Sequence, residues 1–295
     1  MAESNSTVAD AWDDLIKDIQ NTAATIVVVP MVILVASMIM LLITLISIIK
    51  SPEKRRSTPG KLIAWQSGTL LLGYFFSTTL CTILLIFLYD PLTGFIILVF
   101  SIHAIFILMG VFYLSSHFWL NVLCFEVFFR FRSLTSLVVN KDGNSDNFRF
   151  PVYCSYAILT PVFLTLVAAL CIIIVGIDFS SILMIVYGFP VLLLTVANIT
   201  FFTITLRNVL IMKKDTKILH SNESKTSEAK TISSVWLSLK MLLSMLGVTW
   251  IFEAALIIGF ILNLPPKVIF YTAVLTSLRG VTLSSIYLIF NKNKN

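Results

Sequence analysis

Few residues inside the apolar stretches of this chain could carry out chemistry. The only carboxylates in them are Glu126 and Glu253, and Arg279 is the charged side chain nearest the centre of a stretch. The two glutamates belong to different stretches and different depths, so they do not form the adjacent carboxylate pair that acid–base catalysis uses. The histidines and cysteines also lack the spacing of metal ligands. The sequence therefore predicts no enzyme, no metal centre and no cofactor.

Arg279 is the most informative of these residues. It lies about eleven residues into the apolar stretch 268–290, which is about 16 Å along a helix that rises about 1.5 Å per residue. An isolated arginine near the bilayer centre costs at least about 2.5 kcal/mol, so we expect it to face other helices. Glu253 has a matching depth in the preceding stretch, and an ion pair between Glu253 and Arg279 is predicted. A purely stabilising pair and a switching pair remain equally open.

The composition predicts that membrane-spanning helices position these residues. Hydrophobic residues make up 58% of the 295 residues and charged residues 12%, and the mean hydropathy is +0.95. A typical soluble domain has about 25% charged residues, so we predict an all-α membrane protein. A spanning helix needs about 20 apolar residues. Seven stretches qualify, at 23–49, 62–88, 95–129, 151–176, 181–211, 235–262 and 268–290.

The distribution of Lys and Arg predicts the orientation in the membrane. Most of them follow the first, third, fifth and seventh stretches, whereas the opposite side has only Lys17 and Lys267. This placement puts the N-terminus outside and the C-terminus in the cytoplasm, and it accounts for the net charge of +6 without a nucleic-acid partner. Asn5 begins an Asn-Ser-Thr glycosylation pattern on the outer side. The predicted parts are an extracellular tail, a seven-helix domain and a cytoplasmic tail, at 1–22, 23–290 and 291–295.

Several short motifs follow one another in a consistent order on these stretches. The third contains FWLNVLCFE, the sixth LGVTWIFE and the seventh SLRGV, at 118–126, 246–253 and 277–281. Gly60-Lys61 and Gly73-Tyr74 lie in or before the second, and Tyr-Gly-Phe-Pro opens the fifth at 187–190. Together they resemble the Methuselah-like receptors, the insect branch of the secretin and adhesion class of G-protein-coupled receptors. The resemblance covers about residues 25–290.

The resemblance implies a receptor in the plasma membrane that signals by rearranging its helices. The residues expected at its ligand-binding or switching core are Trp250, Glu253, Arg279 and Asn121. Those expected to face a heterotrimeric G protein are Glu126, Arg130, Arg132, Lys213, Lys214 and Lys240. The basic ones would also meet anionic lipid headgroups. Asn121 and Asn198 are expected to hydrogen-bond across helices, and the short outer loops favour a small or lipidic ligand.

The chain also departs from the family pattern. It has no large ectodomain rich in disulfides, and no Cys stands where the third helix would be tied to the second outer loop. Leu123 occupies the position where vertebrate relatives have a glutamate. A second hypothesis is therefore a membrane protein of the same fold that does not signal. In that case the protein is a truncated copy, such as one captured by a virus and placed in the host cell membrane, that modulates other receptors.

Overall fold

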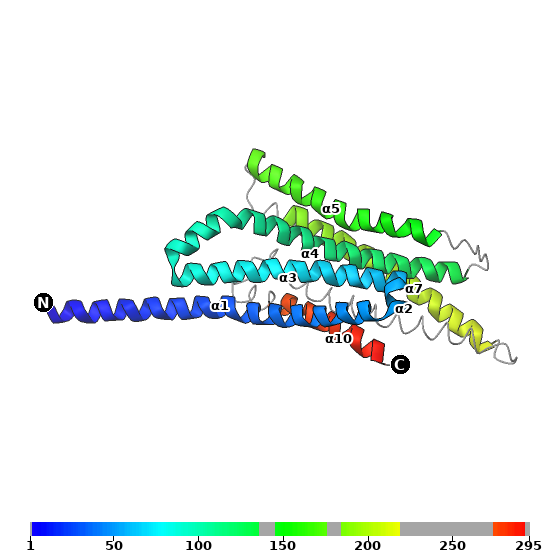
Figure 1. Cartoon of the computed structure of the whole chain (residues 1–295), viewed down its shortest axis with the longest axis horizontal. Helices are drawn as coiled ribbons and strands as arrows, with labels where there is room; N and C mark the ends of the chain where they lie inside the picture. The colour runs from blue at the N-terminus through cyan, green and yellow to red at the C-terminus, as the bar shows by residue number, and fades with distance from the viewer. Residues whose placement is uncertain (1, 136–144, 176–183, 219–273, 293–295) are drawn as a thin grey trace.

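The computed structural model describes residues 2–135, 145–175, 184–218 and 274–292, and these ranges are almost entirely helical (Figure 1). Residues 274–277 form a helical turn just before the last helix. The helices are α1 (Ala2–Lys50), α2 (Pro52–Arg56), α3 (Thr58–Tyr89), α4 (Pro91–Thr135), α5 (Ser145–Val175), the π-helix η1 (Met184–Gly188), α7 (Phe189–Ile218) and α10 (Arg279–Lys292).

Five helices within the described ranges are long and apolar enough to cross a membrane. They correspond to the first five predicted stretches, and their apolar parts are Thr22–Lys50, Thr58–Tyr89, Pro91–Phe129, Arg149–Cys171 and Val186–Asn208. The apolar part of the last helix, Val274–Ile289, is shorter. The sixth predicted stretch, 235–262, lies outside the described residues. The chain is therefore a helical, multi-pass membrane protein.

The helix ends are set by local hydrogen bonds. The Ser57 hydroxyl accepts from the Gly60 amide at 3.2 Å and caps α3, as serine commonly does at the start of a helix. The Asp90 carboxylate accepts from the Thr93 amide at 3.3 Å in the first turn of α4. Hydrogen bonds from the Thr93 side chain and amide hold the pKa of Asp90 below its ordinary value. Asp90 therefore marks the tight turn between α3 and α4.

The helices pack as an elongated bundle (Figure 1). Helices α3 and α4 lie antiparallel and make the most extensive contact, α1 lies against α3, and both α5 and α7 lie against α4. Helix α10 contacts α1 and α3. The C-terminal ends of α1, α4, α7 and α10 lie toward one end of the bundle, together with the start of α3. The helix ends that flank the predicted basic loops therefore lie at one end of the bundle.

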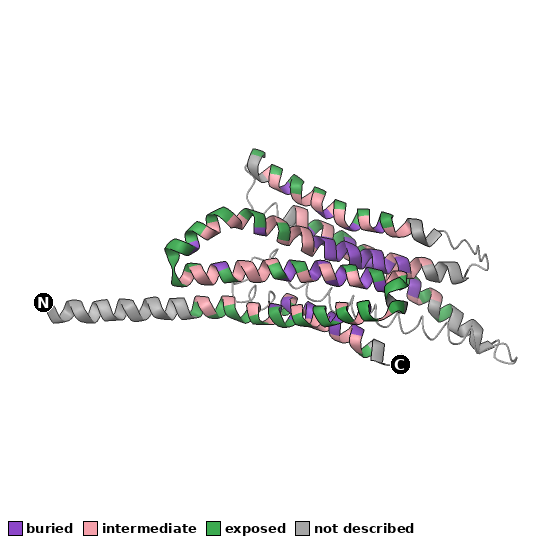
Figure 2. Ribbon diagram, viewed as in Figure 1, coloured by how far each residue is buried: buried purple, intermediate pink, exposed green. Residues whose placement is uncertain are grey.

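Many large apolar side chains are exposed on the outside of the described helices, and Figure 2 shows where these helices are buried. Buried residues concentrate where α3 and α4 face each other and their neighbours. Helix α5 instead exposes four large apolar side chains at helical spacing, Leu159, Phe163, Leu166 and Leu170. A soluble protein rarely exposes such a continuous apolar stripe. Lipid chains are the environment that suits it, which agrees with the span lengths.

Candidate functional site

The last helix is interrupted just before α10. Residues 274–277 are helical, Leu278 forms a turn, and the helix resumes at Arg279. At this break the Tyr74 hydroxyl of α3 accepts from the Gly280 amide at 3.1 Å and lies 3.3 Å from the Thr276 carbonyl, to which it donates. In a regular helix that amide and that carbonyl would bond to each other. A side chain inserted into the hydrogen-bond ladder is a recognised cause of a helix kink.

Gly280 allows the helix break to approach two other helices. A Cβ atom at this position would lie 2.7 Å from Ser37 Cβ of α1 and 2.7 Å from Tyr74 Cε2 of α3, which is closer than real Cβ contacts allow. The Ser37 hydroxyl donates to the Ser277 carbonyl at 2.5 Å. Small residues permit this kind of close helix contact in membranes. The start of α10 is therefore held against both α1 and α3.

Arg279, beside this contact, is buried in the bundle with 1% of its surface exposed. Its Nη1 atom lies 3.1 Å from Nε2 of His117, a buried residue of α4. A guanidinium can only donate hydrogen bonds, so His117 Nε2 must be the acceptor. The imidazole is then neutral and carries its proton on Nδ1. This contact joins the last helix to α4.

Tyr187 brings the π-helix to the same histidine. Its hydroxyl lies 3.4 Å from His117 Nε2, and the two rings meet edge to face with centroids 6.1 Å apart. Tyr187 belongs to η1, the wider turn that opens α7. Pro190, the second residue of α7, has no backbone amide hydrogen to continue the hydrogen-bond ladder. Such π turns are common at functional sites because they redirect side chains.

A second polar contact lies one helical turn further along α4. Asn121 Nδ2 donates to Asn198 Oδ1 of α7 at 2.9 Å, and the Tyr156 hydroxyl of α5 donates to Asn121 Oδ1 at 3.3 Å. This confirms the expected hydrogen bond across helices. Asn121 follows His117 by four positions, so both lie on one face of α4. That face carries polar contacts of α4 with α5, with α7 and with the last helix.

Glu126, which is expected to face a G protein, is buried in the bundle. Its side chain is 1% exposed and accepts a hydrogen bond from the Tyr153 hydroxyl of α5 at 2.9 Å. It follows His117 by nine positions, which turns it about half a revolution around a helix of 3.6 residues per turn. Its carboxylate contacts α5 inside the bundle, and its expected role facing a G protein stays a prediction.

The other predicted residues lie at helix ends or outside the described part of the chain. Arg130 and Arg132 belong to the last turns of α4, and Lys213 and Lys214 to those of α7. Asn5 belongs to the first turns of α1. The remaining predicted residues, Trp250, Glu253 and Lys240, lie outside the described ranges. The predicted ion pair of Arg279 with Glu253 therefore stays a prediction.

The sequence interpretation missed three residues of this site. Tyr74 and His117 contact the last helix and Tyr187 contacts His117, yet each of them lies in a mostly apolar stretch. Tyr74 and Tyr187 did fall within the motifs. The spacing of His117 four positions before Asn121 was the one signal available for the histidine, because it places both on the same helix face.

We name the set Tyr74, His117, Tyr187, Arg279 and Gly280 the polar core. It offers a buried cation, its acceptor and hydroxyl groups, which suit the exchange of hydrogen bonds between helices. No protein-family model and no curated protein sequence matches this chain.

Proposed function

We propose that this chain is a receptor of the Methuselah-like type, which transmits a signal across the membrane to a heterotrimeric G protein. The observation that carries the proposal is the contact of Arg279 with His117. It joins the last helix to α4 by a buried charged group. The polar core also draws together residues from three of the segments on which the resemblance rests, namely Tyr74, Tyr187 and the Arg279-Gly280 pair.

The proposed mechanism is a shift between two helix arrangements. In one, the polar core holds α10 against α3 and α4, as described above. In the other, Arg279 exchanges its contact with His117 for another acceptor, and Glu253 is the candidate that the sequence supplies. A ligand that binds one arrangement more tightly shifts the population toward it. A small or lipidic molecule entering among the helices fits this scheme.

The cytoplasmic surface of the proposed receptor is basic. Arg130, Arg132, Lys213, Lys214 and Lys240 would face the G protein and anionic lipid. The gathering of helix ends at one end of the bundle supports a single basic face. The proposed orientation has the N-terminus outside, with Asn5 glycosylated, in the plasma membrane or the host cell membrane. Removal of N-glycans should then sharpen the electrophoretic band of the wild type, and Asn5→Gln should abolish that change.

The signalling proposal is tested by measuring basal activation of each G-protein family in cells that express the full chain. The key variant is His117→Leu, which removes the acceptor of Arg279. Thr200→Val is a matched control, because the Thr200 hydroxyl is exposed and bonds only within its own helix, to the Val196 carbonyl. We expect basal output from the wild type and the control, and a several-fold change in His117→Leu at equal surface expression.

Flat output from all three proteins, at verified surface levels, would overturn the signalling proposal. It would favour the second candidate, a non-signalling protein of the same fold that modulates other receptors. In both candidates the polar core stabilises the bundle, but only the receptor requires it to change state. Co-expression with an active receptor would then show whether the chain alters its surface level or its output.

A further inference from the structure

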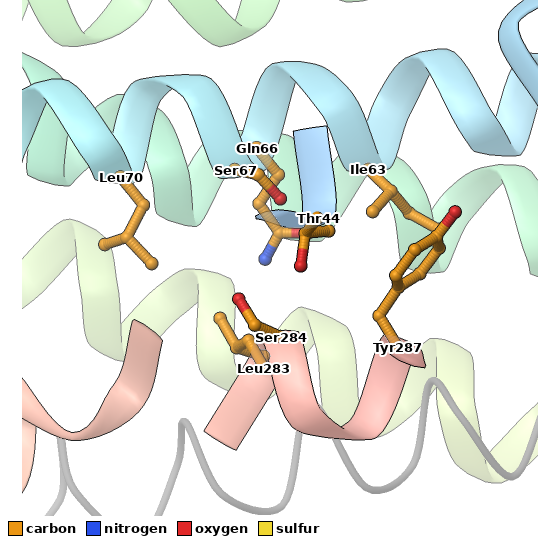
Figure 3. Close-up of a pocket in the computed structure, with 8 residues that line it drawn as sticks. All are labelled: Thr44, Ile63, Gln66, Ser67, Leu70, Leu283, Ser284 and Tyr287. Carbon is orange, nitrogen blue, oxygen red and sulfur yellow. The ribbon is translucent and has the colours of Figure 1, made fainter. Parts of the chain in front are cut away.

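A narrow cavity lies between α1, α3 and α10 (Figure 3). Its volume is about 10 Å³, which is about the space that one water molecule needs. The side chains in its walls are a mixture of apolar and uncharged polar groups. They are Thr44 from α1, Ile63, Gln66, Ser67 and Leu70 from α3, and Leu283, Ser284 and Tyr287 from α10.

Besides the Tyr287 hydroxyl, which points away from the cavity in Figure 3, two buried polar atoms of its walls have no hydrogen-bond partner among the residues that the structure describes. They are Nε2 of Gln66 and Oγ of Ser284, in residues that are 3% and 1% exposed. Figure 3 shows the Gln66 amide nitrogen and the Ser284 hydroxyl directed into the space between α3 and α10. A buried polar group without a partner costs free energy. The cavity is thus polar, water-sized and lined by groups that need a partner.

Thr44 supplies a third polar atom, an oxygen that can accept a hydrogen bond. Its hydroxyl donates to the Met40 carbonyl of its own helix at 3.1 Å. The proton of Thr44 is therefore used, and its oxygen can still accept a hydrogen bond. Gln66 Nε2 can only donate. The walls accordingly present at least one donor and one acceptor, together with a serine hydroxyl that can act as either.

We propose that this cavity binds one water molecule as a bridge between the last helix and α1 and α3. The water oxygen accepts from Gln66 Nε2, and its two protons are donated to Ser284 Oγ and Thr44 Oγ1. A cation would be repelled by the amide donor and would find no carboxylate among the lining residues. An anion would find too few donors. Water matches the set because it donates and accepts.

The water would extend the attachment of α10 below its first turn. Ser284 follows Gly280 by four positions and lies on the same helix face. The Tyr74 hydroxyl would hold the start of α10, and the water would hold the next turn. This role does not depend on whether the chain signals.

The direct test is a cryo-EM reconstruction of the full chain in lipid nanodiscs, at a resolution that shows ordered water. We expect a density peak within about 2.7–3.2 Å of both Gln66 Nε2 and Ser284 Oγ. A cavity without density in a map that shows other ordered waters would overturn the proposal. This test uses only the wild type and therefore does not depend on any variant folding.

The second test is the melting temperature of Gln66→Met and Ser284→Ala, alone and together. If water is bound, each single change should lower the melting temperature, and the double variant should melt no lower than the worse single variant. If the cavity is dry, Gln66→Met removes an unsatisfied donor and should raise the melting temperature, which would contradict the proposal. Strictly additive losses would also contradict it.

A cation is distinguished from water by exchanging the salt. Replacing Na⁺ by choline should leave the melting temperature of the wild type unchanged, and a sodium-dependent shift would overturn the assignment to water. Thr200→Val combined with Ser284→Ala is the matched control for the double variant. Thr200 is exposed on α7, so the losses of that pair should simply add.

Discussion

The Tyr74 hydroxyl stands 3.1 Å from the Gly280 amide and takes the hydrogen bond that this amide would make within a regular helix. One side chain of α3 thereby opens the backbone ladder of the last helix, and the missing side chain of glycine makes room for it. The contact between these two residues positions Arg279 beside His117.

Tyr74→Phe should destabilise the protein. The change leaves the ring in place and removes the group that bonds both the Gly280 amide and the Thr276 carbonyl. A buried hydrogen-bonding group that loses its partner costs about 1–3 kcal/mol, so the melting temperature should fall. Tyr89→Phe is the matched control, because Tyr89 is exposed and surface changes usually stay within about 0.5 kcal/mol. Equal stability of the two variants would contradict the assigned role.

Gly280→Ala should also destabilise the protein, but through overpacking. The added methyl group would meet Ser37 and Tyr74 at 2.7 Å, and overpacking costs about 1–3 kcal/mol. Gly68→Ala in α3 is the control, because a Cβ there meets nothing within 4 Å. That change should stabilise the helix by up to about 1 kcal/mol. Thermal unfolding in detergent compares the two variants. If both changed the melting temperature in the same direction, the steric argument would be refuted.

His117→Leu should lower stability because it removes the acceptor of a buried guanidinium. Hydrogen bonds to charged groups contribute about 1.5–3 kcal/mol. His117→Gln can still present an acceptor oxygen to Arg279 and should recover part of the loss. Thermal unfolding measures the stability of each variant, and the signalling assay measures its activation of G proteins, so the two effects are determined separately. If His117→Gln is no more stable than His117→Leu, the acceptor role is wrong.

Asn121 and Asn198 should be energetically coupled. In a double-mutant cycle with Asn121→Leu and Asn198→Leu, the second change should cost less once the first has removed its partner. Side-chain hydrogen bonds inside membrane proteins average about 0.6 kcal/mol and reach about 1.7 kcal/mol. We expect a coupling energy in this range from unfolding measurements. Asn121→Leu paired with Thr203→Val on the exposed side of α7 should show none.

The turn between α3 and α4 should respond to acid. Because its hydrogen bonds lower the pKa of Asp90 in the folded protein, its ionised form contributes stability above the unfolded pKa. This contribution is lost as the pH falls through the lowered pKa. Asn also caps helices but does not titrate. The wild type should therefore lose stability relative to Asp90→Asn on acidification, and a constant difference in melting temperature would contradict the capping role.

The sequence by itself determined the local features of this protein. The length of each apolar stretch was enough to predict the five helices confirmed here, because a bilayer requires about 20 apolar residues per crossing. The burial of Arg279 could also be predicted, since a lone cation in lipid is too costly to leave exposed. A hydrogen bond between Asn121 and Asn198 could be expected as well, because polar side chains in membrane helices commonly hydrogen-bond across helices.

Only the tertiary structure decided which residues meet. His117 and Arg279 are 162 positions apart, and their contact depends on how α4 and the last helix are rotated about their axes. The rotation of α4 also turns Glu126 toward Tyr153 of α5. Apolar composition is nearly the same around these helices, so it does not specify their rotation. That rotation is set by close contacts such as Gly280 with Ser37 and Tyr74, and these exist only once the helices have packed.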